Sequence, residues 1–349
     1  MSTQAPSRPR YSLVIPLYNE ELVLPQLFAA LDALLDKMDA PAEAILVDDG
    51  SRDGSAELAT LKTRADPRYR FVGLSRNFGH QIAITAGMDR AEGDAVIVMD
   101  ADMQDPPEVV LQLIAKWKEG YDVVYAQRLA REGEGWFKRA SATLFYRLLA
   151  RLSAVDIPRD TGDFRLIDRA VLRAFGQMRE RDRFVRGMFA WMGFRQTAVT
   201  FNRAARGAGE TKYPLRKMMA LAFNGIVGFS DAPLRLALWV GTAVSALAML
   251  YGLYVIGMWF SHDPSLVSGW SSTVVIIAFL SGVNMLMTGL MGLYIGRIYN
   301  EVKGRPLYLV RDEQGLDRAA RERSVFPPLA RLQENFVAES ARPGRISAT

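Results

Sequence analysis

The stretch Ala95-Val96-Ile97-Val98-Met99-Asp100-Ala101-Asp102 decides how this chain folds, because an apolar run ends there in two carboxylates. A short apolar run bounded by polar residues is typical of a buried strand. Side chains two residues apart share one side of an extended backbone, so Asp100 and Asp102 can reach one cation together. Gln104 continues this spacing, and a set of oxygen ligands favours Mg²⁺ or Mn²⁺. The alternative is an acidic strand end that only caps the next helix.

Around this stretch, short apolar segments alternate with helical ones. The pattern predicts strands at residues 12–15, 44–47, 70–74, 95–99 and 123–126, separated by helices at 21–35, 55–64, 81–90 and 107–118. Such alternation predicts βαβ units and an α/β fold with a mainly parallel sheet. The two carboxylates would then lie at the carboxyl edge of the sheet, where open α/β sheets bind phosphorylated ligands.

Charge is distributed unevenly along the 349 residues, although the net charge is only +5. Residues 236–296 contain no Lys or Arg, and Asp263 is their only acidic residue. Residues 234–260 and 270–296 are each long enough to cross ~30 Å of hydrocarbon as a helix. They predict a two-helix transmembrane hairpin joined by the short loop 261–269. The alternative is a pair of buried core helices.

The cations that flank the hairpin predict its orientation. Loop 261–269 has none, whereas Arg235, Arg297, Lys303 and Arg305 lie beyond the outer ends. Positive charge stays on the cytoplasmic side, so we expect both termini to be cytoplasmic and the loop external. Residues 1–10 hold no apolar stretch, so no cleavable signal is expected. The absence of cysteine excludes disulfides and thiol catalysis.

Two further segments have the pattern of helices lying on a membrane surface. Residues 136–152 form an apolar face with cations around it, and residues 214–230 lead toward the first predicted span. The alternative for each is an ordinary helix packed on the core. The predicted organisation is thus a catalytic domain over residues 1–213, the helix 214–230, the hairpin, and a basic segment with a partly flexible tail over 297–349.

Polar motifs also follow the first two predicted strands. Residues 16–21 end the first, and residues 48–55 end the second. Carboxylates there could accept hydrogen bonds from a base or a ribose, and Gly50 could let the backbone approach a ligand. These loops could form a nucleoside pocket. The alternative is turn chemistry, with Ser51 or Asp53 as an N-cap.

Three later motifs carry charge that could meet an anion. Residues 76–81 lie at the start of a helix whose N-terminus could face a phosphate. A histidine at such a position, here His80, more often packs against neighbours or caps the helix than acts as a base. Residues 160–166 bring two carboxylates and an arginine. Arg206 and Lys212 belong to a glycine-bearing loop that could close over phosphate.

Taken in order, the motifs resemble those of the bacterial polyisoprenyl-phosphate glycosyltransferases of glycosyltransferase family 2, relatives of dolichol-phosphate mannose synthase. The matching segments are residues 18–21, 48–51, 76–81, 100–108, 163–166, 209–213 and 294–299. The resemblance runs from about Tyr11 to Tyr308 and leaves the tail uncovered.

This resemblance implies a GT-A fold on the cytoplasmic face of the bacterial plasma membrane, and it implies roles for individual residues. Seven would bind the nucleotide sugar: Pro16, Tyr18, Glu20, Asp48, Asp49, Asp100 and Ala101. Asp100, Asp102 and Gln104 would hold Mn²⁺ or Mg²⁺. Four cations would meet the donor or lipid phosphate: Arg128, Arg139, Arg206 and Lys212. Asp163 would orient or deprotonate the acceptor, with Asp102 and Asp160 as further catalytic residues.

The reaction implied is attack of a polyprenyl phosphate oxygen, that of undecaprenyl phosphate, on the anomeric carbon of the sugar, with inversion. A lipid monophosphate with a second pKa near ~6 is largely ionised at neutral pH, so a strong base is less necessary. Family resemblance favours glucose from UDP-glucose. Glycines at 282, 289, 292 and 296 could let helices pack closely, so we expect a homo-oligomer, and a tetramer fits.

Three other functions are weighed against this one. A family 2 polysaccharide synthase would need a larger membrane channel and a Gln-x-x-Arg-Trp signature, which the sequence lacks. A non-catalytic sugar-nucleotide binding module would not need Asp100 and Asp102 intact. A dehydrogenase is disfavoured because no Gly-x-Gly-x-x-Gly follows the first strand, and no nucleic-acid partner is expected.

Overall fold

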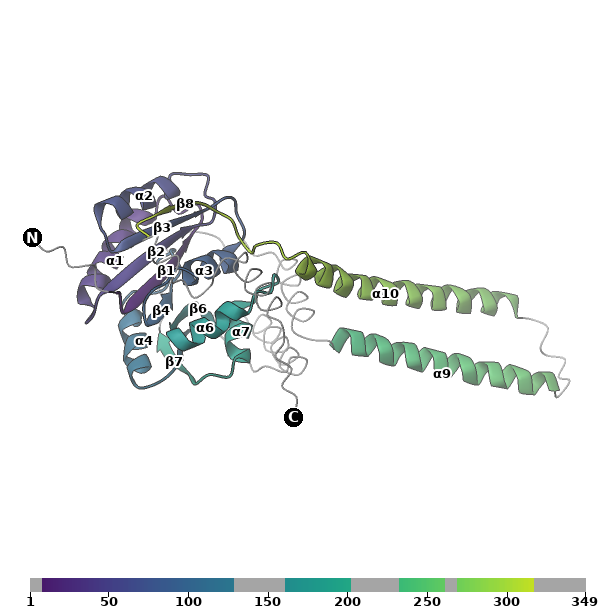
Figure 1. Cartoon of the computed structure of the whole chain (residues 1–349). Coiled ribbons are helices and arrows are strands. Elements are labelled where there is room, and N and C mark those ends of the chain that lie inside the picture. The colour runs from purple at the N-terminus through teal and green to yellow at the C-terminus, as the bar shows by residue number, and fades with distance from the viewer. Residues whose placement is uncertain (1–7, 129–160, 202–231, 261–268, 317–349) are drawn as a thin grey trace, which may run out of the picture. The chain divides into compact units, whose positions relative to one another are not determined.

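The computed structural model describes residues 8–128, 161–201, 232–260 and 269–316 (Figure 1). The chain forms two compact units. The first comprises residues 1–134, 155–210 and 306–349, and the second residues 135–154 and 211–305. The first unit contains the sheet, and the second contains two long helices.

The first unit is built on one eight-stranded sheet with the order β7-β5-β6-β4-β1-β2-β3-β8. Four neighbouring strands pair in parallel at its centre: β1 (Tyr11–Leu17), β2 (Ala42–Asp48), β3 (Tyr69–Leu74) and β4 (Ala95–Val98). Beyond β4, β5 (Val123–Arg128) pairs in parallel with β7 (Gln196–Phe201). The remaining two are antiparallel to their neighbours: β6 (Thr161–Asp168) and β8 (Val310–Gln314).

Helices connect the parallel strands as the sequence predicts. They are α1 (Leu24–Lys37), α2 (Ser55–Ala65), α3 (His80–Met88) and α4 (Val109–Lys118). Two shorter helices, α6 (Arg169–Gln177) and α7 (Val185–Trp191), follow β6. In α1 the buried leucines recur every three or four residues, which gives one apolar face toward the sheet. The predicted α/β fold with a mainly parallel sheet is therefore confirmed.

Helix α3 packs closely on the sheet at Gly87. A Cβ atom on Gly87 would lie 2.3 Å from Val14 Cγ1 and 2.9 Å from Val47 Cγ2. Only glycine therefore fits between α3 and strands β1 and β2 at this depth. The N-terminus of α3, which begins at His80, is held against the carboxyl edge of the same strands.

Strands β6, β7 and β8 are not among the strands that the sequence predicts. The sequence indicates only a charged motif at residues 160–166 and a polar tail from Arg311 onward. The structure instead pairs β8 with β3 at the edge of the sheet. Its residues are mostly polar, so their strand conformation depends on hydrogen bonds to β3 rather than on an apolar pattern.

A buried polar cluster secures the segment around β8 to helix α3. The Tyr308 hydroxyl donates to Asp89 Oδ2 at 2.7 Å and accepts from Arg90 at 2.9 Å. Arg90 also pairs with Glu313 at 2.6 Å. The Ser75 backbone N–H donates to the Leu309 carbonyl at 2.8 Å. The chain after the last long helix thus returns to the first unit and becomes part of it.

Changing Tyr308 to phenylalanine should destabilise the first unit. Asp89 would lose a buried donor, which costs about 1–3 kcal/mol. The measurement is the midpoint of thermal unfolding of the full chain. Tyr121→Phe is the matched control, because the Tyr121 ring lies under Arg195 at a distance from this cluster. Equal midpoints for the Tyr308 variant and the wild type would contradict the assigned role of the hydroxyl.

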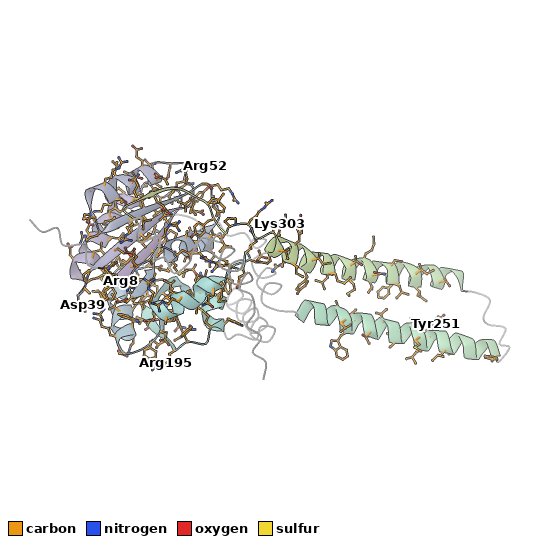
Figure 2. All side chains as sticks on the ribbon, in the orientation of Figure 1. Arg8, Asp39, Arg52, Arg195, Tyr251 and Lys303 are labelled. Carbon is orange, nitrogen blue, oxygen red and sulfur yellow. The ribbon has the colours of Figure 1, made fainter. Side chains whose placement is uncertain are left out.

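The second unit contains helices α9 (Ala232–Phe260) and α10 (Trp270–Val302), which run antiparallel side by side (Figure 1). Large apolar side chains are exposed on both, Tyr251 of α9 among them (Figure 2). In the described part of the chain, one helical stretch, Phe279–Val302, is long and apolar enough to cross a membrane. The apolar stretch of α9, Ala237–Tyr251, is shorter. The two-span hairpin is therefore not confirmed.

The predicted surface helices 136–152 and 214–230 lie outside the described residues.

Candidate active site

A pocket of about 310 Å³ opens at the carboxyl edge of the sheet. Strand β1 lies between β2 and β4 there, and loops leave these strands toward opposite sides. Open α/β sheets bind ligands at such a position. Six of the seven residues predicted to bind a nucleotide sugar line the pocket: Pro16, Tyr18, Glu20, Asp49, Asp100 and Ala101. Asp102 lines it as well, whereas Asp48 does not.

The loops after β1 and β2 bind each other and form one rim. Asn19, at φ 57°, donates its backbone N–H to Ser51 Oγ at 3.0 Å, and its side-chain oxygen accepts from the Arg52 backbone at 2.9 Å. The Gly54 N–H donates to Glu21 at 2.9 Å. The polar residues of these loops thus do serve as turn residues, but neither Ser51 nor Asp53 is the N-cap of α2, because Gly54 holds that position. The rim leaves the Tyr18 ring 43% exposed along the pocket wall.

Asp49 connects this rim to the loop after β3. Its two carboxylate oxygens accept from the backbone N–H groups of Phe78 and Gly79, at 2.7 and 2.9 Å. Burial raises the pKa of Asp49, although these two bonds oppose the rise. Its neighbour Asp48 instead accepts from the Ser51 N–H at 3.1 Å, within its own turn. Asp49 therefore both shapes the pocket and faces it.

Gly50 does not approach a ligand as the sequence suggested. It adopts φ 70°, and a Cβ atom there would lie 2.5 Å from the Arg76 carbonyl carbon and 2.7 Å from the Asn77 nitrogen. The close approach is thus to the loop after β3. The expectation that Gly50 admits a ligand is corrected, because protein backbone occupies the space beside it.

Carboxylates crowd the inner wall of the pocket. Asp100 Oδ1 is buried and accepts no hydrogen bond from the described residues. Burial raises the pKa of Asp100, and the charges of Asp163 and Asp102 add to this effect while His80 opposes it. Burial also raises the pKa of Glu20, with further contributions from Asp102, Asp53 and Asp100. Such mutual repulsion is what a bound cation relieves.

The predicted metal ligands are only partly brought together. Asp100 and Asp102 line the pocket, whereas Gln104 is buried and is not in its lining. The Gln104 backbone N–H donates to Asp102 Oδ1 at 3.0 Å, across a turn in which Met103 adopts φ 56°. Over the described ranges, no three His, Asp or Glu side chains converge as a complete metal site. The described residues thus bring together two of the three predicted ligands, Asp100 and Asp102.

Behind the pocket, one buried carboxylate collects several partners. Asp163, on β6, accepts from Gln81 Nε2 and from Arg186 Nε, both at 2.9 Å. His80 Nε2 lies 3.3 Å from Asp163 Oδ2 and 3.4 Å from Asp100 Oδ1. Burial by itself lowers the pKa of His80, but the bond to Asp163 and the charges of both aspartates outweigh it and raise that pKa. His80 therefore connects Asp163 to the pocket.

These contacts make Asp163 a poor base. Burial alone would raise the pKa of Asp163, but His80, Arg186 and Arg165 outweigh it and hold that pKa well below its usual range. The Arg165 guanidinium is itself buried, and burial lowers its pKa to about 10. A carboxylate held ionised in this way orients its neighbours better than it accepts a proton.

Two members of this cluster are not predicted from the sequence. Gln81 lies inside a motif, residues 76–81, but the motif indicates no function for its amide. Arg186 belongs to α7 and to none of the motifs, so no local pattern indicated it. Of the predicted phosphate-binding residues, Arg128 ends β5 and does not line the pocket. The others, Arg139, Arg206 and Lys212, lie outside the described residues, as does Asp160.

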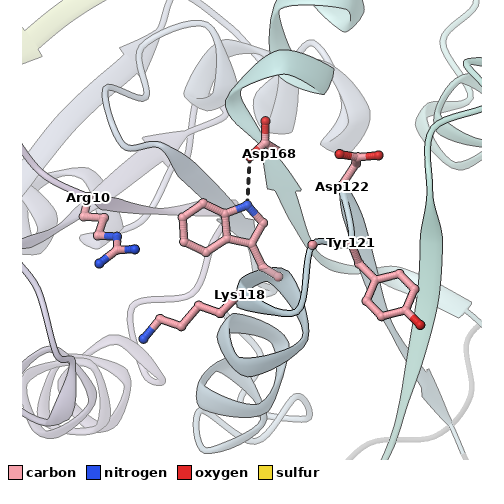
Figure 3. A pocket seen from close by; sticks show the side chains of 7 residues that line it. Arg10, Lys118, Tyr121, Asp122 and Asp168 are labelled. Atoms are coloured by element: carbon pink, nitrogen blue, oxygen red, sulfur yellow. Dashed lines mark hydrogen bonds between the residues drawn. The ribbon is translucent and has the colours of Figure 1, made fainter.

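A larger hollow of about 510 Å³ lies at the opposite edge of the sheet (Figure 3). Its acidic groups already have protein partners. Asp168 accepts from Trp117 Nε1 at 2.8 Å, as Figure 3 shows, and Asp122 accepts from the Arg195 N–H at 2.9 Å. Arg10 lies over the Trp117 ring at 5.5 Å. Greater volume thus does not make it the better candidate site.

The mainly parallel α/β sheet, with an acidic pocket beside β1 and β4, has the arrangement of a GT-A-like fold. Residues 12–176 match the family described as glycosyl transferase family 2. A relative named uncharacterized glycosyltransferase YkcC, from Bacillus subtilis, is 49% identical over 88% of this chain and 95% of its own length. The chain therefore belongs to glycosyltransferase family 2 and is a glycosyltransferase.

Other similar proteins carry more specific names. The bactoprenol glucosyl transferase of Shigella phage SfII is 38% identical over 86% of this chain and 97% of its own length. Among solved structures, glucosyl-3-phosphoglycerate synthase from Mycobacterium tuberculosis, in complex with Mn²⁺, UDP and glucosyl-3-phosphoglycerate, has 21% identity and a TM-score of 0.43. That match covers 63% of this chain and 78% of the synthase.

Proposed function

We propose that this protein transfers a sugar from a nucleotide sugar, UDP-glucose in the first instance, to polyprenyl phosphate at the cytoplasmic face of the bacterial plasma membrane. The observation that carries the proposal is the acidic pocket in which Asp100 and Asp102 meet the nucleoside-facing loops. Support for the acceptor comes from relatives named bactoprenol glucosyl transferase, which align over most of the chain.

The nucleoside end of the donor would occupy the side of the pocket near Asp49 and Tyr18. Each Asp49 oxygen accepts one backbone N–H and keeps a further lone pair, so the carboxylate can still accept from a base N–H. The exposed Tyr18 ring offers an apolar surface for the base. Pro16 adds a rigid apolar wall at the same place.

Asp100 and Asp102 would hold Mn²⁺ or Mg²⁺ together with oxygens of the diphosphate. The donor set fits a hard cation, because Asp100 Oδ1 is buried and accepts no hydrogen bond from the described residues, while Asp102 adds to the raised pKa of Asp100. When bound, the ion neutralises the leaving nucleotide diphosphate. We assign Gln104 to the turn that orients Asp102, since its backbone N–H bonds that carboxylate.

The acceptor phosphate would act as the nucleophile without a strong base. Its second pKa is near ~6, so it is largely ionised at neutral pH. A phosphate oxygen forms a bond to the anomeric carbon while the bond from that carbon to the donor diphosphate breaks. Inversion then gives a β-linked polyprenyl-phosphate sugar. Asp163 serves to position His80 beside the reacting groups.

The long helices suit a membrane-bound acceptor. Helices α9 and α10 expose large apolar side chains along their lengths, and residues 236–296 lack Lys and Arg. We propose that both cross the bilayer, with both chain ends cytoplasmic. Space beside Gly282, Gly289 and Gly296 on α10 would allow another helix to pack there, which supports a homo-oligomer.

The decisive experiment incubates the purified full chain with undecaprenyl phosphate and a panel of labelled sugar nucleotides. Label from one sugar should enter the organic phase only when lipid phosphate is present. Label in a polymer would indicate a polysaccharide synthase instead. Nucleotide binding without transfer of any sugar in the panel would indicate a binding module and would overturn the proposal.

Removal of divalent cations should stop transfer. Because Asp100 and Asp102 repel the diphosphate unless a cation lies between them, we expect the rate to fall about 100-fold or more in EDTA. Added Mn²⁺ or Mg²⁺ should restore it, and the release of nucleotide diphosphate measures both effects. An unchanged rate after complete chelation would refute the metal site.

A further inference from the structure

We propose that Gln81 and Arg186 are positioning residues for the transfer reaction, which hold Asp163 and through it His80 at the wall of the pocket. The inference rests on the proposed function, because it assigns residues to that same site. Neither residue lines the pocket itself. The geometry that carries the inference is a closed set of bonds joining α3, β6 and α7.

Gln81 uses both ends of its side-chain amide. Its Nε2 donates to Asp163 Oδ2 at 2.9 Å, and its Oε1 accepts from the Val185 backbone N–H at 3.1 Å. One side chain of α3 thereby fixes a carboxylate on β6 and the first turn of α7. Because the donor and the acceptor ends both have partners, the amide can adopt only one orientation.

Arg186 completes the set from the adjacent position in α7. Its Nε donates to Asp163 Oδ1 at 2.9 Å, and its Nη2 donates to Oδ2 at 3.3 Å. A two-point contact of this kind fixes the plane of the carboxylate as well as its position. The Asp163 side chain is only 5% exposed, so it is held from several sides and cannot turn toward solvent.

The position of Asp163 affects the pocket through His80. The fixed Asp163 Oδ2 lies 3.3 Å from His80 Nε2, which in turn lies 3.4 Å from Asp100 Oδ1. Asp100 and His80 both line the pocket. A shift of Asp163 would therefore move the imidazole relative to Asp100. Misplacement of a site group by about 1 Å can cost 10²-fold in rate.

The chain offers close controls for a purely structural role. Gln196 on β7 is another half-buried glutamine, and its amide donates to the Phe189 carbonyl of α7 at 2.8 Å instead of to Asp163. Arg179 forms an ion pair with Asp89 at 2.9 Å and is 37% exposed, against 33% for Arg186. Changes at Gln196 and Arg179 therefore remove similar contacts in the same unit without removing a bond to Asp163.

The test is a double-mutant cycle on the full chain, with Gln81→Leu, Asp163→Asn and the two combined. Gln81→Leu should lower kcat about 10- to 100-fold, with UDP binding changed by less than about 3-fold, because the nucleoside loops are untouched. The double variant should be no slower than Asp163→Asn alone, because Gln81 acts through Asp163. Gln196→Leu should keep kcat within about 2-fold of the wild type.

The inference would be overturned if the loss in kcat of the double variant equalled the product of the two single losses. Equal losses in kcat for Gln81→Leu and Gln196→Leu would also overturn it. Arg186→Lys and Arg179→Lys give a second pair, in which only the former should lower kcat. If Gln81→Leu does not fold, Gln81→Glu keeps the side-chain size but places a carboxylate against Asp163, and it should lose a similar factor in kcat. Absence of transfer by the wild type would instead count against the proposed function.

Discussion

Replacement of Asp102 by alanine should abolish sugar transfer and leave the protein folded. Asp102 lies in the pocket wall, and in the proposed site it would provide, with Asp100, the two protein ligands of the diphosphate-binding cation. Loss of that charge stabilisation should lower the rate about 10³-fold or more. The structural cost is small, because Asp102 is partly exposed and the bond that it accepts from the Gln104 backbone lies within its own turn.

The measurement is initial rate at saturating Mn²⁺, together with the rise in unfolding midpoint that Mn²⁺ and UDP produce. Both should be lost in Asp102→Ala. Asp36→Ala is the matched control, because Asp36 is an exposed acid near the end of α1 and does not line the pocket. Turnover at the wild-type rate by Asp102→Ala with metal present would refute the assigned role.

Asp163→Asn should lower the transfer rate about 100-fold without changing the shape of the pH profile. The folded-state pKa of Asp163 is depressed, because His80, Arg186 and Arg165 outweigh the opposing effect of burial. Asp163 is therefore ionised throughout the neutral range and accepts no proton there. The rate should instead rise through pH ~6 as the lipid phosphate ionises, and then level off.

Both enzymes should therefore show the same rising limb, with the variant lower at every pH. If Asp163 were the base, the variant would lose the limb itself, and this result would contradict our assignment. Asp122→Asn serves as the control, since Asp122 bonds the Arg195 backbone at the opposite edge of the sheet. Its rate should stay within about 2-fold of the wild type.

The same depressed pKa predicts a change in stability. A carboxylate whose folded pKa lies below the unfolded value of about 4 contributes stability above that value, which is lost as pH falls through the folded pKa. Asp163→Asn should thus lower the unfolding midpoint at pH 7, because Arg165 and Arg186 lose their counter-ion. The variant and the wild type should converge as the pH is lowered toward the folded pKa.

The central sheet was predictable because its strands are buried on both faces. The sequences of strands β1 to β4 are short apolar runs, and each strand is followed by a segment whose residue pattern predicts a helix. The mostly polar strand β8 gives no such signal, since its conformation depends on the β3 edge. Strand β6 gives no signal for a different reason: although it is buried between β4 and β5, its charged residues Asp163 and Arg165 interrupt the apolar pattern.

The sequence by itself determined the α/β class and the pocket residues that follow parallel strands, such as Asp49, Asp100 and Asp102. Carboxyl ends of parallel strands must meet at one edge, so local patterns are enough to place them. Only the tertiary structure decided that Gln81, Arg186 and Asp163 converge, and that Gly50 faces protein instead of ligand. These contacts join segments far apart in the chain, so they depend on how helices pack on the sheet and leave no periodic signal in the sequence.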